Sequence, residues 1–331
     1  MDLLFFCAAA FLALANGAND NFKGMATLWG SGTLSYGKAL FLANVMTFIG
    51  AALALAIGGA LLETFSGKGV VPPDTLQNPH FALAFALGAG LCVFIATVTR
   101  FPISTTHALL GALAGAGFFF NGTDVQFSVL LDKGLIPLAI SPLLAVLLTW
   151  GLWRSRHHLR HIPIKWLTES AFLSRKTDKA GDLAHILSGS AVCLARGIND
   201  TPKIASIFLL GGVMFGEHTI LLFCGIGLLM VVGSVLFSHK VAHRISHEIT
   251  SMSHKEGLTG NLVTAGLVLA ASVFGLGVST THVSVGALFG IGLMNHHAHK
   301  DKIIGILLAW ILTLPSAFAL AYGSALIITG L

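Results

Sequence analysis

The chain has 331 residues, of which 14 are Asp or Glu and 19 are Lys or Arg, so only 10% carry a formal charge. A soluble globular protein carries about 25%. With 55% hydrophobic residues and a mean hydropathy of +0.83, the composition excludes a soluble enzyme, a nucleic-acid-binding protein and a disordered chain. In a membrane protein the net charge of +5 is what basic cytoplasmic loops produce.

Ten hydrophobic segments follow one another, and a polar stretch divides them into two sets of five. The first half, residues 1–153, holds segments at about 1–18, 38–62, 80–98, 103–120 and 135–153. A basic linker, residues 154–182, leads to the second half, residues 183–331, with segments at about 183–198, 219–237, 258–277, 280–294 and 303–330. Long apolar blocks predict helices rather than barrel strands. We expect an all-α polytopic membrane protein in which short, Gly-rich segments form broken helices or re-entrant hairpins.

The basic residues predict which side of the membrane each loop faces. Seven lie in the linker and five more in loops 238–257 and 295–302, whereas loops 63–79 and 121–134 hold one each. The positive-inside rule then places the linker in the cytoplasm and both termini outside a multi-pass protein of the plasma membrane. Because five is an odd number of crossings, the second half enters the membrane in the opposite sense to the first.

Two motifs recur in the same order in both halves. A-x-G-x-N-D-x-x-K begins at Ala15 and again at Ala195, and S-T-T-H begins at Ser104 and again at Ser279, so the two offsets are nearly equal. Each S-T-T-H leads into G-A-L-x-G, which predicts a close-packed helix face. The paired offsets indicate a duplication. Repeats of opposite orientation are typical of secondary transporters, whose substrates bind at discontinuous helices near mid-membrane.

The first motif predicts an opening in its helix. Gly17 and Gly197 precede Asn-Asp, a pair that favours caps and non-helical backbone, and Pro202 suits the first turn of a restarting helix. We therefore expect Asn19 and Asn199 to lie at breaks whose freed amides, helped by the helix dipole, hold an anion.

The acidic and basic members of that motif are the strongest candidates for function. Of the 14 acids, only Asp20 and Asp200 lie in repeated motifs inside apolar sequence, where a carboxylate is expensive and usually functional. One interpretation is a purely structural ion pair with Lys23 or Lys203, three residues on. The other, which we favour because both halves keep the arrangement, is a cation site or ion cluster that opens and closes during transport.

The S-T-T-H motif supplies hydroxyl groups that can donate to an anion or accept from a cation. Pro102 favours a helix start at the first copy, so that the run would cap a helix. Such hydroxyls also join membrane helices in a purely structural role, but two matched copies favour binding by Ser104, Thr105, Thr106, Ser279, Thr280 and Thr281. His107 and His282 would orient the hydroxyls, relay protons or bond a buried carbonyl.

The remaining candidates for metal chemistry are weaker. His239, His243 and His247 are spaced i, i+4 and i+8, as zinc ligands on a helix can be, but they lie beside Lys and Arg on the predicted cytoplasmic side, where a basic interfacial belt is the plainer interpretation. The four cysteines are isolated and predict no disulfide or metal framework. No cofactor is expected beyond Na⁺ as a coupling ion.

The paired G-x-N-D motifs, each followed downstream by P-x-S-T-T-H or its close variant, resemble those of the inorganic phosphate transporter (PiT) family, over roughly residues 10–120 and 190–295. The resemblance implies an inverted-repeat transporter of inorganic phosphate, driven by Na⁺ or H⁺. We also expect a protein that lies in the bilayer, forms a homodimer and binds no nucleic acid. The resemblance implies that the Asn-Asp breaks and the hydroxyl runs line a central site, with Na⁺ near Asp20 and Asp200.

One departure from the family pattern affects the coupling ion. The usual first motif resembles G-A-N-D-V-A-N, with Asn where this chain has Lys23, and here both halves have Lys at that position. A fixed ammonium beside each Asp could replace Na⁺ as the counter-charge of the anion, which predicts weak or proton-based coupling. Three alternatives stay open: a sulfate or other oxyanion permease of the same family, an anion channel, and an intramembrane hydrolase with Asp20, Asp200, His107 and His282 as metal ligands.

Overall fold

The computed structural model describes residues 1–159, 179–212 and 219–330, and these contain helices and no strand. Most of the expected linker, 154–182, lies outside the described residues. The helices are α1 (Asp2–Asp20), α2 (Ala26–Gly30), α3 (Tyr36–Ile57), α4 (Gly59–Phe65), α5 (Pro73–Leu76), α6 (Pro79–Val98), α7 (Thr105–Asn121), α8 (Phe127–Leu130), α9 (Ile136–Leu159), α11 (Lys179–Leu210), α12 (Thr219–Phe237), α13 (His239–His243), α14 (His254–Val273), α15 (Thr280–Asn295) and α16 (Lys300–Thr329).

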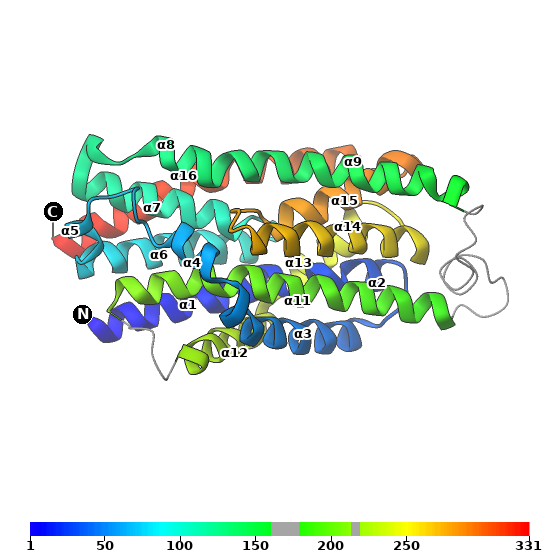
Figure 1. Cartoon of the computed structure of the whole chain (residues 1–331), viewed down its shortest axis with the longest axis horizontal. Coiled ribbons are helices and arrows are strands. Elements are labelled where there is room, and N and C mark those ends of the chain that lie inside the picture. The colour runs from blue at the N-terminus through cyan, green and yellow to red at the C-terminus, as the bar shows by residue number, and fades with distance from the viewer. Residues whose placement is uncertain (160–178, 213–218, 331) are drawn as a thin grey trace.

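The helices reproduce the ten predicted segments. Within the described residues, seven helical stretches are long and apolar enough to cross a membrane. The other three segments correspond to α7 and α15, with 17 and 16 residues, and to α11, which carries the charged motif. Figure 1 shows the pair α6–α7 at the end of the molecule that holds both termini, and the pair α14–α15 in the opposite half. The two pairs are therefore helical hairpins that enter the bundle from opposite ends.

The two halves are related as inverted repeats. In Figure 1, α1 runs from the end with the termini toward the linker end, whereas α11, its counterpart in the second half, runs back the other way. The second helix of each half packs on the first helix of the other: α3 on α11, and α12 on α1. The last helices cross in the same manner, because α16 packs on α7 and α9 packs on α15. The halves therefore interlock and bury much of their apolar surface against each other.

Glycines permit the close approach of these crossing helices. A Cβ added to Gly111 of α7 would lie 2.3 Å from the Leu314 carbonyl oxygen of α16, and one added to Gly286 of α15 would lie 2.6 Å from that of Pro142 in α9. These are the first glycines of the two G-A-L-x-G runs, so the close-packed faces predicted from sequence are confirmed.

The helix opening predicted at the two glycine–Asn–Asp motifs is wrong in one half and displaced in the other. Helix α1 continues through Gly17 to Asp20, and a 3-10 turn over Asn21–Met25 follows it. Helix α11 continues unbroken through Pro202. In an apolar interior the backbone N–H and C=O groups on either side of the proline find hydrogen-bond partners only within the helix, which keeps α11 intact. The proline ring packs at the α3–α4 junction, where a Cβ on Gly58 would lie 2.2 Å from Pro202 Cγ.

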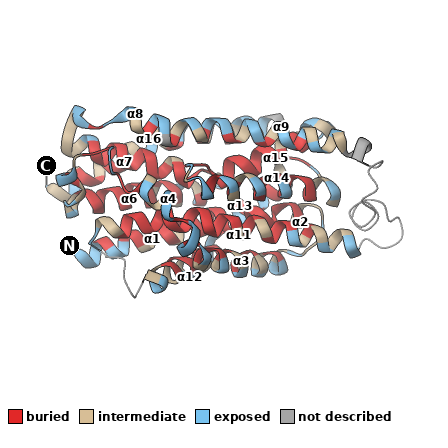
Figure 2. Cartoon of the chain, viewed as in Figure 1, coloured by how far each residue is buried: buried red, intermediate tan, exposed pale blue. Residues whose placement is uncertain are grey.

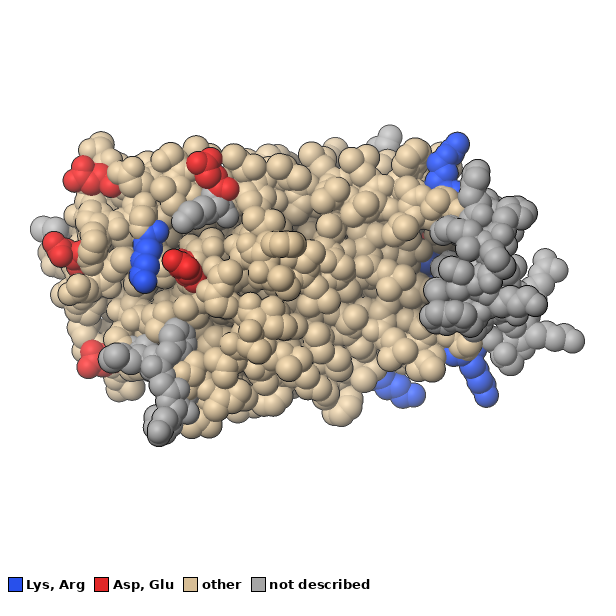
Figure 3. Space-filling model, in the orientation of Figure 1, with Lys and Arg blue, Asp and Glu red and all other residues tan. Residues whose placement is uncertain are grey.

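Burial and charge are distributed as in a protein that spans a bilayer. The buried residues concentrate in the middle of the bundle, while α9, α12 and α16 present exposed apolar side chains (Figure 2). On the face in Figure 3, most of the Lys and Arg side chains lie at the linker end, while the Asp and Glu side chains lie at the end with the termini together with a basic side chain; the surface between the two ends is uncharged. Within the described residues, the buried carboxylates and ammonium groups are those of Asp20, Lys23, Asp200 and Lys203.

Candidate functional site

The ammonium group of Lys23 lies in a nest of oxygen atoms from both halves of the chain. Its Nζ donates to the carboxylate of Asp20 and the hydroxyl of Thr281, and to Asn19 Oδ1 at 3.2 Å and the Ile103 carbonyl at 3.1 Å. Thr281 donates to the same Ile103 carbonyl at 2.7 Å. The lysine, Asn and Asp come from the end of α1 and the turn after it, whereas Thr281 comes from α15 of the other half.

Lys203 has the same surroundings with the halves exchanged. Its Nζ donates to Asn199, to Thr106 Oγ1 at 2.9 Å, to the Val278 carbonyl at 2.9 Å and to Asp200 Oδ1 at 3.5 Å. Thr106 donates to the Val278 carbonyl at 3.2 Å. Each lysine therefore reaches its own Asn and Asp, and the last threonine of the opposite S-T-T-H motif.

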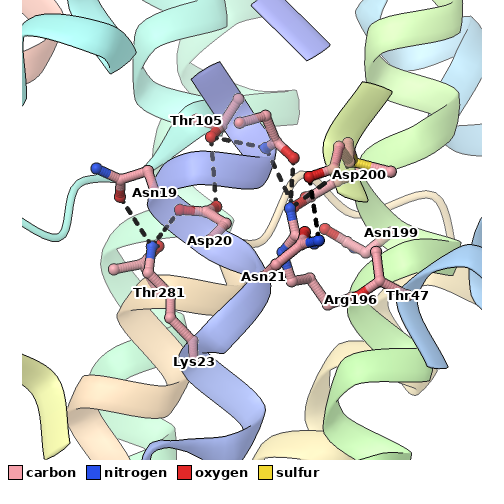
Figure 4. A network of polar contacts seen from close by, with 12 residues as sticks. Asn19, Asp20, Asn21, Lys23, Thr47, Thr105, Arg196, Asn199, Asp200 and Thr281 are labelled. Carbon is pink, nitrogen blue, oxygen red and sulfur yellow. Dashed lines mark hydrogen bonds and ion pairs between the residues drawn. The ribbon is translucent and has the colours of Figure 1, made fainter. Parts of the chain in front are cut away.

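A chain of polar contacts joins the two nests (Figure 4). Thr105 Oγ1 donates to Asp20 Oδ2 at 3.3 Å and accepts from Asn16 Nδ2 at 2.9 Å. Asn16 Nδ2 also donates to Asp200 Oδ2 at 3.4 Å. Arg196 forms an ion pair with Asp200 at 3.4 Å and donates to the side-chain oxygens of Asn16 and Asn21. The carboxylates of both halves thus belong to one buried network.

The two asparagines are held by residues that the sequence did not indicate. Asn19 Nδ2 donates to Thr97 Oγ1 at 3.0 Å, and Asn199 Nδ2 donates to Ser272 Oγ at 2.8 Å. Thr97 and Ser272 are separated by the same offset as the two copies of the S-T-T-H motif. A search at that offset for similar rather than identical residues would have found them.

The other residues of the S-T-T-H motifs have different environments. Ser104 and Ser279 are the N-caps of α7 and α15 and accept from the backbone N–H of His107 at 3.1 Å and of His282 at 3.3 Å. Thr280 is buried at the start of α15. The structure therefore brings Thr105, Thr106 and Thr281 into the polar network and gives the two serines a capping role.

The two histidines lie close together, and each directly follows the threonine that bonds a lysine. Their ring centroids are 4.7 Å apart, and His282 stacks on Trp310 at 3.8 Å. His282 Nδ1 lies 3.3 Å from the Leu138 carbonyl, and both rings line an apolar cavity of about 700 Å³ between α9, α15 and α16. No hydrogen bond joins either side chain to Asp20 or Asp200 among the described residues.

The metal-site alternatives find no support in the geometry. Among the described residues, no three His, Cys, Asp or Glu side chains are placed to share a metal ion, so the four ligands of the hydrolase alternative are not brought together. On the linker side, His243 and His247 pack around Trp29, with His247 at 4.7 Å from that ring. Partial burial and the neighbouring His243 lower the pKa of His247, which favours its neutral form.

A helical bundle of two inverted repeats, with a buried ionic site where their hairpins meet, defines the class of inverted-repeat membrane transporters. The comparisons with known proteins give the family. Residues 16–321 match the phosphate transporter family, and the chain belongs to it. This confirms the resemblance seen in the motifs and the expectation of a transporter rather than an enzyme.

Two relatives match along nearly their whole length. A protein named as a putative phosphate permease in Pyrococcus furiosus is 24% identical, with 94% of this chain and 92% of that protein covered. One named as a probable low-affinity inorganic phosphate transporter in Bacillus subtilis is 26% identical, with 95% and 92% covered. A solved structure described as the sodium-dependent phosphate transporter shares the fold with a TM-score of 0.85 at 22% identity, with 100% of this chain and 99% of that chain covered.

Proposed function

We propose that the protein is a secondary active transporter that carries inorganic phosphate across the membrane by alternating access at the central ionic site. The observation that carries the proposal is the reciprocal placement of Lys23 and Lys203, each of which bonds a hydroxyl of the other half. Rocking one hairpin away from the opposite half would break one of these contacts and keep the other, as alternating access about a fixed site requires. The names of the relatives support phosphate as the anion.

We further propose that the two ammonium groups take the place of coupling Na⁺ ions. Each is surrounded by a carboxylate, an amide oxygen, a backbone carbonyl and a hydroxyl, which are the oxygen ligands that hard cations prefer. Coupling would then be weak in Na⁺ or proton-based, with His107 and His282 as candidate relay groups. The description of the related structure as sodium-dependent applies to a protein only 22% identical.

Uptake of labelled phosphate into proteoliposomes tests both proposals. The native protein should accumulate phosphate in competition with arsenate, with little response to a Na⁺ gradient and a larger response to a pH gradient. Lys23→Asn, which introduces the residue usual in the family, should make uptake more dependent on Na⁺. Strict, saturable Na⁺ dependence of the native protein would refute the substitution of Na⁺ by lysine. Preference for sulfate would identify an oxyanion permease of different specificity.

Counterflow separates a transporter from an anion channel. Vesicles preloaded with unlabelled phosphate should draw in labelled phosphate against its gradient, which a channel cannot do. Asp20→Asn and Asp200→Asn should abolish this exchange. A native protein that conducts phosphate without counterflow would contradict the proposal.

We also propose that the linker end faces the cytoplasm and both termini lie outside, because the basic residues gather at the linker end (Figure 3). In a cysteine-free background, Lys68→Cys near the termini should react with a membrane-impermeant maleimide in intact cells. Lys240→Cys at the linker end should react only after the cells are opened. The reverse pattern would invert the orientation. The expected homodimer stays a prediction.

A further inference from the structure

One difference in charge breaks the two-fold symmetry of the ionic site. The Asn, Asp and Lys positions of the first motif hold the same residue in both halves, and Thr105 and Thr106 recur as Thr280 and Thr281. Asn16, however, is matched by Arg196 at the equivalent position of the second motif. The two side chains are in contact, since Arg196 donates to Asn16 Oδ1.

This difference leaves the site with an excess of positive charge. Asp20 is paired with Lys23, and Asp200 with Lys203, so each half is balanced without Arg196. The guanidinium shares Asp200 with Lys203, at 3.4 and 3.5 Å respectively, and Arg196 is only 1% exposed. Within the described residues it forms no ion pair with a second carboxylate. A buried charge without a counter-charge is costly, so the site is built to receive an anion.

The contacts of Arg196 suit an oxyanion that comes and goes. Its Nη atoms donate to the amide oxygens of Asn16 and Asn21, which are neutral acceptors that anionic oxygens can replace. Its Nε is buried and has no hydrogen-bond partner among the residues that the structure describes. A guanidinium presents a planar fork of donors that matches two oxygens of a phosphate group.

We propose that Arg196 is the principal ligand of the transported oxyanion, and that the anion binds asymmetrically, beside α11, rather than midway between the two lysine nests. The proposal rests on the proposed function and adds the residue that provides the charge. Lys23 and Lys203 then act mainly as fixed cations for the two carboxylates.

Equilibrium binding of inorganic phosphate to the purified full chain in nanodiscs tests the assignment. Arg196→Asn places the residue of the first half in the second half, removes the excess charge, and should weaken phosphate binding by roughly tenfold or more. Arg154→Asn, which removes one charge from an exposed side chain of α9, is the matched control and should keep the native affinity.

A double variant distinguishes binding from a structural role. Asn16→Arg combined with Arg196→Asn moves the guanidinium to the mirror position of the repeat, and phosphate affinity should recover substantially. Arg196 Nη2 also donates to the sulfur of Met230 in α12 at 3.8 Å. If Arg196 were needed only for this contact, the exchange would not restore binding, and that result would overturn the assignment.

Two further outcomes complete the test. Should Arg196→Asn fail to yield folded protein, Arg196→Lys, which keeps the charge and loses the fork of donors, should still raise the Kd several-fold. Native phosphate affinity in Arg196→Asn or in Arg196→Lys overturns the proposal. If the native protein itself shows no saturable phosphate binding, the proposed function fails instead, so the two failures are distinguishable.

Discussion

At the scale of single residues, the buried pair of Asp20 and Lys23 makes each member depend on the other. Removal of one partner from a buried ion pair costs about 3–5 kcal/mol, because it leaves an uncompensated charge. Asp20→Asn and Lys23→Asn should therefore each lower the melting temperature in detergent. The double variant should be more stable than the sum of the two losses predicts. Strictly additive losses would contradict the pairing.

The sequence predicted four of the buried charged residues, Asp20, Lys23, Asp200 and Lys203, but not the residues with which they interact. The repeats identified Asp20, Lys23 and their counterparts because identical residues recur at a fixed offset. The comparison of the repeats did not indicate Arg196, because it gives weight to positions at which the two halves hold identical residues. The contact of Lys23 with Thr281 was also unforeseen, since spacing along one helix predicts the neighbours of a residue only within that helix.

At the scale of elements, the bend before each S-T-T-H motif has a left-handed residue at equivalent positions, Arg100 with φ 68° and Gly275 with φ 66°. The carbonyl of Arg100 accepts from Arg244 Nη1 at 3.3 Å, and that of Gly275 from Thr64 Oγ1 at 3.1 Å. Thr64 and Arg244 are themselves equivalent, because their offset is that of the two Asn-Asp motifs. Each bend is thus fastened to the short helical segment that follows the second helix of a half.

This equivalence predicts opposite effects of two substitutions. Arg100→Gly should stabilise the protein by up to about 1 kcal/mol, since only glycine adopts a positive φ without strain. Gly275→Ala should destabilise it, because the new Cβ would also lie 2.7 Å from Ala60 Cβ. Thermal unfolding of both variants in the same detergent gives the two signs. A loss of stability in Arg100→Gly would contradict the strain argument.

The crossing of α3 and α11 depends on Gly197, where a Cβ would lie 2.3 Å from the Thr47 carbonyl oxygen. Gly197→Ala should force the helices apart and cost about 1–3 kcal/mol. Gly181→Ala in the same helix, where a Cβ meets nothing within 4 Å, should be neutral or slightly stabilising. Monodispersity and melting temperature measure both. Equal behaviour of the two variants would show that the close approach does not limit stability.

Element boundaries were predictable because lipid demands long apolar runs, and α6 and α12 almost coincide with the segments predicted at 80–98 and 219–237. The roles of Gly197 and Pro202 were not predictable from local signals alone. Glycine and proline break helices in water, but inside this bundle they serve contacts with α3 and with the α3–α4 junction. Tertiary packing therefore decides whether such a glycine or proline breaks a helix or makes a close contact.

At the scale of the whole molecule, the crossed packing predicts that neither half folds alone. Residues 1–159 expressed without the second half would leave the faces of α1 and α3 that contact α12 and α11 exposed, and residues 179–331 would lack their partners in the same way. Each half should therefore be degraded or aggregate. The two halves co-expressed as separate chains should purify together and bind phosphate. Stable, monodisperse behaviour of one half alone would contradict the interlocked arrangement.

The contact between Asn16 and Arg196 also bears on the ancestry of the chain. Before the halves were joined in one gene, both copies would have carried the same residue at this position. Two arginines there would have placed two guanidinium groups in contact, and two asparagines would have left the site without its excess charge. The present combination requires two copies that have diverged, so a dimer of identical chains with asparagine there would have held its anion by the shared lysines and threonines alone.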